Sequence, residues 1–244
     1  MNKSTRTSTW KRYGAAVAIA ATLAGCATTA INPNDPLEPF NRAMFQFNDG
    51  LDNVVLKPAG EAYRTVIPSL VRTGVKNFFS NVEDLWIGVN NLLQGKVEEG
   101  LTDFMRVAVN TFFGFTVIDV ASDAGMTKHN EDFGQTLGRW GVGSGPYVVL
   151  PFFGSSTFRD GVGLAFDFQA DPVVNVGHVP TRNTLYSVRV ISERANLLDA
   201  SRILEEAALD KYGFTRDSYL QRRRSLIYDG NPPREERPVN NDAR

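Results

Sequence analysis

The sequence is poor in the residues that build most metal and redox centres. Its 244 residues include one cysteine and two histidines, His129 and His178. Zinc sites usually need several cysteine or histidine ligands, so no metal centre of this kind is expected. A single cysteine also cannot form a disulfide within the chain. We therefore expect no cofactor.

The sequence also lacks a strong charge of either sign and any clear strand pattern. It has 26 basic and 27 acidic residues, with a net charge of −1. Nucleic-acid-binding domains usually carry a basic excess, so no nucleic-acid partner is expected. Alternation of apolar and polar residues does not extend over a useful length, whereas apolar residues recur at helical spacing. The sequence therefore predicts an all-α protein.

Catalytic motifs are absent as well. Ser144 lies among glycines, but Val142 and Pro146 stand where the nucleophile elbow G-x-S-x-G needs glycine. The glycines do not match a dinucleotide-binding or phosphate-binding loop. We predict that the protein is not an enzyme. A lipid hydrolase with Ser144 as nucleophile is the less favoured alternative.

The N-terminus has the form of a secretory signal covering residues 1–25. Basic residues precede a short apolar segment, Gly14–Leu23, which is too short to span a membrane as a helix. Leu23-Ala24-Gly25-Cys26 then has the form of a bacterial lipobox, and we predict that Cys26 carries the lipid anchor. Ala27 follows, rather than the aspartate associated with inner-membrane retention. We expect an outer-membrane lipoprotein that faces the periplasm, with residues 26–34 as its tether.

Residues 35–228 have the apolar spacing of one helical domain. The motif Asp35-Pro36-Leu37-Glu38 predicts a helix start with Asp35 as N-cap, and Lys57-Pro58 predicts its end. The longest pattern begins at Ser69 and has a broad aromatic face that charged residues interrupt. A helix lying in a membrane interface and a core helix of a soluble bundle both fit it. Residues 229–244 are rich in proline and charge and are predicted to be disordered.

The stretch from Glu131 to Gly163 has an unusual composition. It contains eight glycines and two prolines together with many aromatic and aliphatic residues. Glycine and proline disfavour the interior of regular elements, whereas a surface loop should not carry this much apolar area. An irregular apolar backbone is expected where a chain lines a cavity or meets a membrane while packed against other protein.

Six segments resemble the MlaA (VacJ) family of outer-membrane lipoproteins. They are Asp35–Asn48, Asn90–Lys96, Arg106–Gly114, Asp119–Ser122, Glu131–Gly163 and Asp217–Arg224. Together with the lipobox they cover most of the chain after the signal, in the order of the family. One departure lies at Gly114–Ile118, where the family has a longer run of glycines.

The resemblance implies a ring-like bundle of amphipathic helices that lies in one leaflet of the outer membrane. Its glycine-rich segment is expected to line a central channel, through which phospholipids that stray into the outer leaflet are removed. The implied partners are phospholipid, a trimeric outer-membrane porin and a soluble periplasmic lipid carrier. A purely structural lipoprotein that docks onto a porin is the alternative.

Two sets of site residues follow from this expectation. Those expected to line or gate the channel are Gly134, Gly138, Gly141, Gly143, Gly145, Pro146, Tyr147 and Asp160. Those expected to face the membrane are Phe78, Phe79, Trp86 and Phe112.

Overall fold

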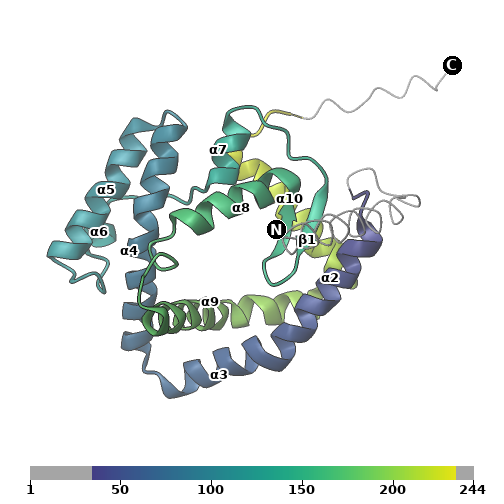
Figure 1. Cartoon of the computed structure of the whole chain (residues 1–244), viewed down its shortest axis with the longest axis horizontal. Coiled ribbons are helices and arrows are strands. Elements are labelled where there is room, and N and C mark those ends of the chain that lie inside the picture. Colours follow the sequence, from purple (N-terminus) through teal and green to yellow (C-terminus); the bar gives the residue numbers. More distant parts are fainter. Residues whose placement is uncertain (1–34, 235–244) are drawn as a thin grey trace, which may run out of the picture.

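The computed structural model describes residues 35–234, whose helices follow one another around a ring (Figure 1). The elements are α2 (Glu38–Leu51), a π-helical turn (Asp52–Leu56), α3 (Lys57–Val66), α4 (Ser69–Leu93), α5 (Val97–Phe112), α6 (Val120–Asp123), α7 (Phe133–Arg139), β1 (Tyr147–Leu150), β2 (Gly154–Thr157), α8 (Phe158–Ala170), α9 (Val179–Ala207) and α10 (Lys211–Ile227). The predicted signal, Cys26, the tether and residues 235–244 lie outside the described residues.

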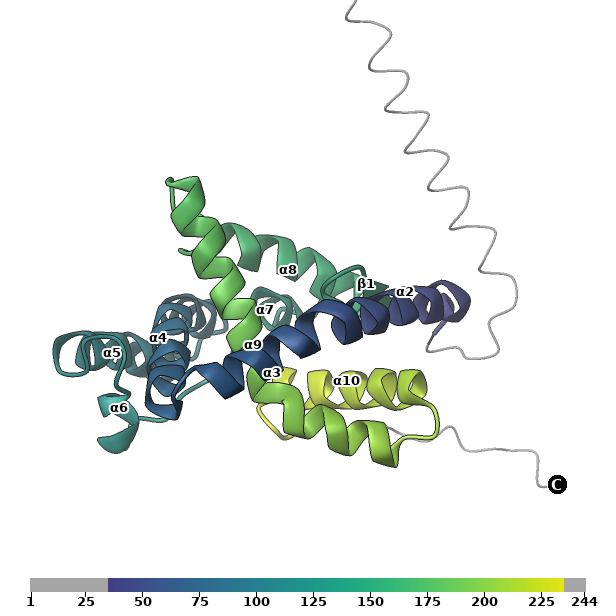
Figure 2. The ribbon, with the colours of Figure 1, turned by 90° about the horizontal axis from the view of Figure 1, so that it is seen from below.

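Packing between successive elements closes the ring. On one side, α4 packs against α7, α7 packs against α8, and α8 packs against the two strands (Figure 1). On the other side, α2 packs against β1 and α3 packs against α9. Helix α9 also packs against α4, which completes the ring. Helix α5 packs on α4, outside the ring. Figure 2 shows α8 and α10 on opposite sides of the layer that contains α2 and α3. The predicted all-α architecture is confirmed, and no described helix is long and apolar enough to cross a membrane.

The glycine-rich stretch is more regular than predicted. It contains the short helix α7 and two four-residue strands that pair antiparallel, with Tyr147 opposite Thr157 and Leu150 opposite Gly154. Strand β1 reads Tyr-Val-Val-Leu and shows no alternation, because residues on both of its faces are at least partly buried. A strand this short depends on hydrogen-bond partners from distant parts of the chain. Local sequence patterns do not reveal such partners.

Helix α2 supplies those partners through two asparagines on one face. The Asn41 side chain donates to the Tyr147 carbonyl at 3.0 Å and accepts from the Val149 amide at 2.8 Å. Two turns further on, Asn48 donates to the Leu150 carbonyl at 2.9 Å and accepts from the Phe152 amide at 2.8 Å. The helix thus satisfies the free edge of β1 as a neighbouring strand would.

Replacing Asn41 with leucine is expected to lower the free energy of unfolding by roughly 2–4 kcal/mol, because it leaves two buried backbone groups without partners. Asn48→Leu is expected to lose less, since its bonds are nearer the surface. Thermal unfolding of the purified protein in detergent measures both. Asn53→Leu is the control, because Asn53 is exposed and, among the described residues, its side chain bonds only to Asp49. Equal losses in all three variants would contradict this account of the strand edge.

The beginning and end of the first predicted helix both need correction. Asp35 is not the N-cap, because the helix begins after Leu37 and the carboxylate of Asp35 is fully buried. It accepts hydrogen bonds from Asn41, Arg216 and the Tyr212 hydroxyl, and so ties the chain to α10. The chain also stays helical through Pro58. The proline falls in the first turn of α3, where its missing N–H is not needed, and the π-helical turn joins the two helices.

Polarity is inverted relative to an ordinary soluble bundle. In the described chain, 17 polar or charged residues are buried, against 10 hydrophobic ones. Large apolar side chains lie outside instead, among them Phe112, Phe113 and Phe115, which are 77%, 72% and 78% exposed. Exposed apolar area on this scale marks a surface that contacts something other than water.

The pairing of α4 and α5 shows the inversion most clearly. Arg106 and Asp84 are fully buried between them, with the Arg106 Nε 3.1 Å from the Asp84 carboxylate. The Arg106 guanidinium also donates to Asp119 at 3.1 Å and to the Met126 carbonyl at 2.7 Å. Gly88 and Gly100 let the helix backbones approach closely, since a Cβ on Gly100 would lie 2.9 Å from the Gly88 carbonyl. Small residues and buried polar groups at a helix interface are typical of helices packed in lipid.

Candidate functional site

A cavity of about 410 Å³ lies between α4, α8 and α9. It is lined by Val82, Glu83, Trp86, Ile87, Asn130, Glu131, Asp132, Phe153, Leu164, Asp167, Phe168, Asp171, Pro172, Tyr186, Arg189, Val190 and Glu193. These residues come from three sides of the ring and from the turn between the two strands. We call it the central cavity. A smaller cavity of about 160 Å³ adjoins it and shares Asp132, Phe153, Leu164 and Asp167 with it.

The lining of the central cavity is amphipathic. Valine, leucine, isoleucine and aromatic side chains from all three helices form its apolar wall, whereas carboxylates and one guanidinium form its polar part. Such a lining can hold apolar chains and a polar group together, which a purely apolar or purely polar cavity cannot do.

Arg189 links three elements across the polar part. Its Nη1 lies 2.7 Å from Asp171, which ends α8, and its Nε lies 3.1 Å from Glu193, one turn further along α9. Its Nη2 lies 3.7 Å from Glu83 of α4, a distance that gives an ion pair but no hydrogen bond. Burial disfavours its charge, but these three carboxylates outweigh burial and raise the pKa of Arg189.

Glu83 and Asp167 are carboxyl groups whose ionisation is disfavoured. Burial is the main cause that raises the pKa of Glu83, and Arg189 only partly opposes it. Burial likewise raises the pKa of Asp167, although the Trp86 indole donates to its Oδ1 at 2.7 Å and the Phe133 amide at 2.9 Å. A raised carboxyl pKa means that the charged form lacks sufficient compensation from the protein.

Two of the acids that line the smaller cavity, Asp160 and Asp132, form ion pairs with arginines. Asp160 lies 2.8 Å from Arg159 and 3.1 Å from Arg223, and the Tyr219 hydroxyl donates to it at 2.8 Å. Burial alone would raise the pKa of Asp160, but Arg223 and Arg159 overcome it and lower that pKa. Arg223 also pairs with Asp132. This cluster joins α7, α8 and α10 and closes one side of the ring.

The predicted channel residues are divided among several places in the structure, and none of them lines the central cavity. Asp160 lines the smaller cavity, whereas Gly138, Gly141 and Gly143 line a third cavity of about 880 Å³ beside α10. Gly145 and Pro146 border β1, outside these linings. Tyr147 is 1% exposed and packs against Tyr212 and Tyr219, which corrects its assignment to a channel wall.

Gly134 has a packing role in the structure. A Cβ on Gly163 of α8 would lie 2.5 Å from the Gly134 amide nitrogen, and one on Gly134 would collide with the Arg223 guanidinium. The two glycines therefore let α7 and α8 touch, rather than giving the chain freedom to move.

The predicted membrane-facing residues divide in the same way. Phe112 is 77% exposed and Phe78 is partly buried. Phe79 is 5% exposed, so the prediction is wrong for this residue. Trp86 is partly buried and lines the central cavity. Periodicity identified the apolar face of α4, but it could not tell which part of that face the ring encloses.

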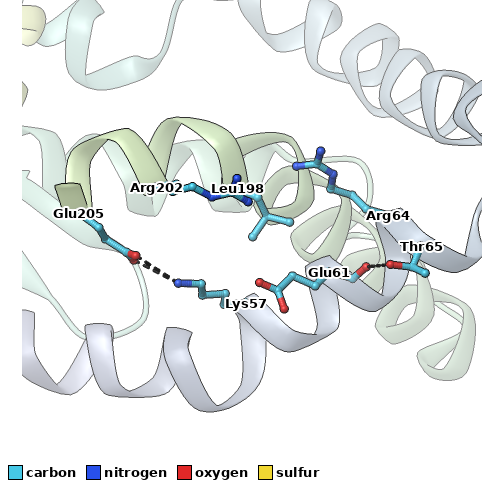
Figure 3. Close-up of a pocket in the computed structure, with 7 residues that line it drawn as sticks. All are labelled: Lys57, Glu61, Arg64, Thr65, Leu198, Arg202 and Glu205. Atoms are coloured by element: carbon cyan, nitrogen blue, oxygen red, sulfur yellow. Dashed lines mark hydrogen bonds and ion pairs between the residues drawn. The ribbon is translucent and has the colours of Figure 1, made fainter. Parts of the chain in front are cut away.

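A further cavity of about 400 Å³ lies between α3 and α9 (Figure 3). Its lining is charged, with the Lys57 ammonium 3.2 Å from Glu205 and the Arg64 guanidinium 3.0 Å from Asp199 of α9. Among the described residues, Leu198 is the only apolar one in its lining. It therefore offers no wall for an acyl chain.

Ser144 has no histidine partner. His129 bonds to Asp103 of α5 at 2.8 Å, and His178 caps the start of α9. Neither can serve Ser144 as a base in this arrangement, because each is held in another part of the ring.

Sequence reasoning missed the residues that give the central cavity its polar character. Glu83 was visible only as a charge that interrupts the apolar stripe of α4, and Asp167 and Arg189 carried no motif. Charges inside an otherwise apolar helical stripe are the signal that points to such residues.

The fold and the cavity define a class: a helical ring with buried polar groups, apolar side chains on its outer surface and an amphipathic cavity between α4, α8 and α9. Residues 33–226 match the MlaA lipoprotein family, and the chain belongs to that family. It is 37% identical to the intermembrane phospholipid transport system lipoprotein MlaA of Escherichia coli K12, over 88% of each chain. The protein of the same name from Haemophilus influenzae is 31% identical, over 85% of this chain and 87% of its own.

A solved structure supports the same assignment. It was described as the structural basis for maintenance of bacterial outer membrane lipid asymmetry, and it matches with a TM-score of 0.69 and 37% identity. The match covers 79% of this chain and 98% of that one.

Proposed function

We propose that this protein removes phospholipids from the outer leaflet of the outer membrane through the central cavity and thereby maintains lipid asymmetry. The observation that carries the proposal is an amphipathic cavity inside a ring whose outer surface is apolar. The relatives named as phospholipid transport lipoproteins support it. Transport by this route moves the lipid without covalent change, so the protein acts without enzymatic chemistry.

The proposal includes a position in the membrane. The exposed phenylalanines contact acyl chains of one leaflet, and the lipid anchor on Cys26 holds the ring at the periplasmic face. A trimeric porin surrounds or braces the ring, and a soluble periplasmic carrier receives the lipid. These partners are proposed from the family resemblance.

Deleting the gene tests the function as a whole. The deletion strain is expected to accumulate phospholipid in its outer leaflet and to become sensitive to detergent, and the intact gene supplied in trans should restore both properties. Enzymatic labelling of surface phospholipid in intact cells measures the accumulation. Normal surface lipid in the deletion strain would overturn the proposal and favour a purely structural role.

The glycines between α7 and β1 allow a narrower test. Gly141 and Gly145 have φ values of +91° and +66°, whereas a Cβ on Gly143 would meet nothing within 4 Å and no left-handed conformation is needed there. Valine at 141 or 145 is expected to impose strain of about 1–3 kcal/mol on this segment and to impair lipid removal. Gly143→Val is the matched control. Detergent survival measures transport, and membrane fractionation checks attachment. Identical behaviour of all three variants would contradict a role for this backbone conformation.

A further inference from the structure

The polar part of the central cavity contains opposite charges in a fixed arrangement. Arg189 is the only basic residue among the described residues that line it. Two of the acids that line the cavity form ion pairs with basic residues outside its lining: Glu131 with Lys96, and Asp132 with Arg223. The other four are Glu83, Asp167, Asp171 and Glu193. The cavity therefore offers one cation and an excess of anions to whatever enters it.

Arg189 has N–H donors that make no hydrogen bond to the described residues. Its Nη1 and Nε donate to Asp171 and Glu193, but its Nη2 donates no hydrogen bond within the described chain and lies 3.7 Å from Glu83. Arginine carries five N–H donors in a planar fork that matches a phosphate. A phosphate oxygen can therefore bind Nη2 without breaking the bonds to Asp171 and Glu193.

Asp167 has one carboxylate oxygen that accepts no hydrogen bond from the described residues. Its Oδ1 accepts from Trp86 and Phe133, whereas its Oδ2 accepts no hydrogen bond from the described residues. No described base forms an ion pair with it. Burial raises the pKa of both Asp167 and Glu83, although Glu83 keeps its ion pair with Arg189. A further cation beside either carboxylate would favour its charged form.

We propose that the central cavity selects zwitterionic phospholipids by binding both charges of the headgroup. Arg189 binds the phosphate, and Glu83 and Asp167 bind the ammonium group of ethanolamine. A phospholipid with a glycerol headgroup has the same phosphate but no ammonium group. It therefore leaves the excess negative charge of the carboxylates without a cationic partner. This inference rests on the proposed function, because it assigns a substrate class to the same cavity.

The test uses the purified full-length protein in detergent micelles, incubated with an equimolar mixture of dioleoyl phosphatidylethanolamine and dioleoyl phosphatidylglycerol. Native mass spectrometry measures the lipid that stays bound. The protein is expected to carry roughly three- to tenfold more phosphatidylethanolamine, the range of one ordinary net hydrogen bond, because water in the cavity weakens a charge-assisted one. The double variant Glu83→Gln, Asp167→Asn should bind the two lipids about equally, with total bound lipid retained. Arg189→Gln should lower the binding of both.

Glu205→Gln is the matched control, because it removes an acid from the cavity between α3 and α9 and should leave the lipid ratio unchanged. Circular dichroism checks that each variant keeps its helical content. Equal binding of both lipids by the unmodified protein, or an unchanged ratio in the double variant, would overturn the selectivity while leaving the proposed function intact. Absence of any bound phospholipid would overturn both.

Discussion

Tryptophan in place of Val190 or Leu164 is expected to abolish lipid removal almost completely. Both residues belong to the apolar wall of the central cavity, one on α9 and the other on α8. An indole at either position occupies the space that acyl chains must use. Cells that carry either variant should be as sensitive to detergent, and as rich in surface phospholipid, as the deletion strain.

The cavity makes these substitutions informative about transport rather than folding. Overpacking a filled core typically costs about 1–3 kcal/mol, but here the new side chain can enter a cavity of about 410 Å³. The variants should therefore reach the membrane in normal amounts. Val66→Trp is the matched control, because Val66 is 74% exposed and lies outside the cavity lining. Normal lipid removal by both cavity variants would contradict the assigned path.

Arg106→Ala is expected to lower the free energy of unfolding by about 3–5 kcal/mol, the usual loss when one member of a buried ion pair is removed. The substitution leaves Asp84, which is fully buried, with Lys128 as its only cationic partner in the described chain. Burial already raises the pKa of Asp84 above its ordinary value despite both cations. Loss of Arg106 should raise that pKa further. Thermal unfolding in detergent measures the change.

Two other variants separate charge from geometry. Arg106→Lys keeps the charge but loses the fork that reaches Asp84, Asp119 and Met126 together, so it should destabilise by an intermediate amount. Arg139→Ala is the surface control. Its guanidinium lies 3.9 Å from Asp229 and is 43% exposed, and its loss should cost about 0–1 kcal/mol. A loss for Arg106→Ala no larger than that for Arg139→Ala would show that the buried network does not hold α4 to α5.

The local elements of this fold were largely readable from the sequence. The apolar spacing that begins at Ser69 predicted α4 at the start observed. The inversion of polarity was not readable, because helical periodicity finds an apolar face without saying whether protein or lipid covers it. Phe79 and Phe112 lie on equally apolar helices, yet one is buried and the other is exposed.

Long-range polar contacts set the limit of prediction at the site. Asn41 pairs with residues more than 100 positions away, and Asp35 with α10 at the far end of the chain, so no local pattern could place them. The first residues of the predicted tail contact the rest of the chain, because Asp229 pairs with Lys96 and the Asn231 amide bonds to Tyr228. The polar residues of the central cavity come from α4, α8, α9 and the segment before α7, and only the closed ring brings them together.

Photo-crosslinking in living cells tests the central claim most directly. A photoreactive phenylalanine analogue is placed at Val190, inside the cavity, or at Phe112, on the apolar outer surface. We expect phospholipid adducts at both positions, and we expect Leu164→Trp to remove the adduct at 190 while leaving the adduct at 112. Adducts at 112 alone would contradict the account, because lipid would then contact the ring only from outside.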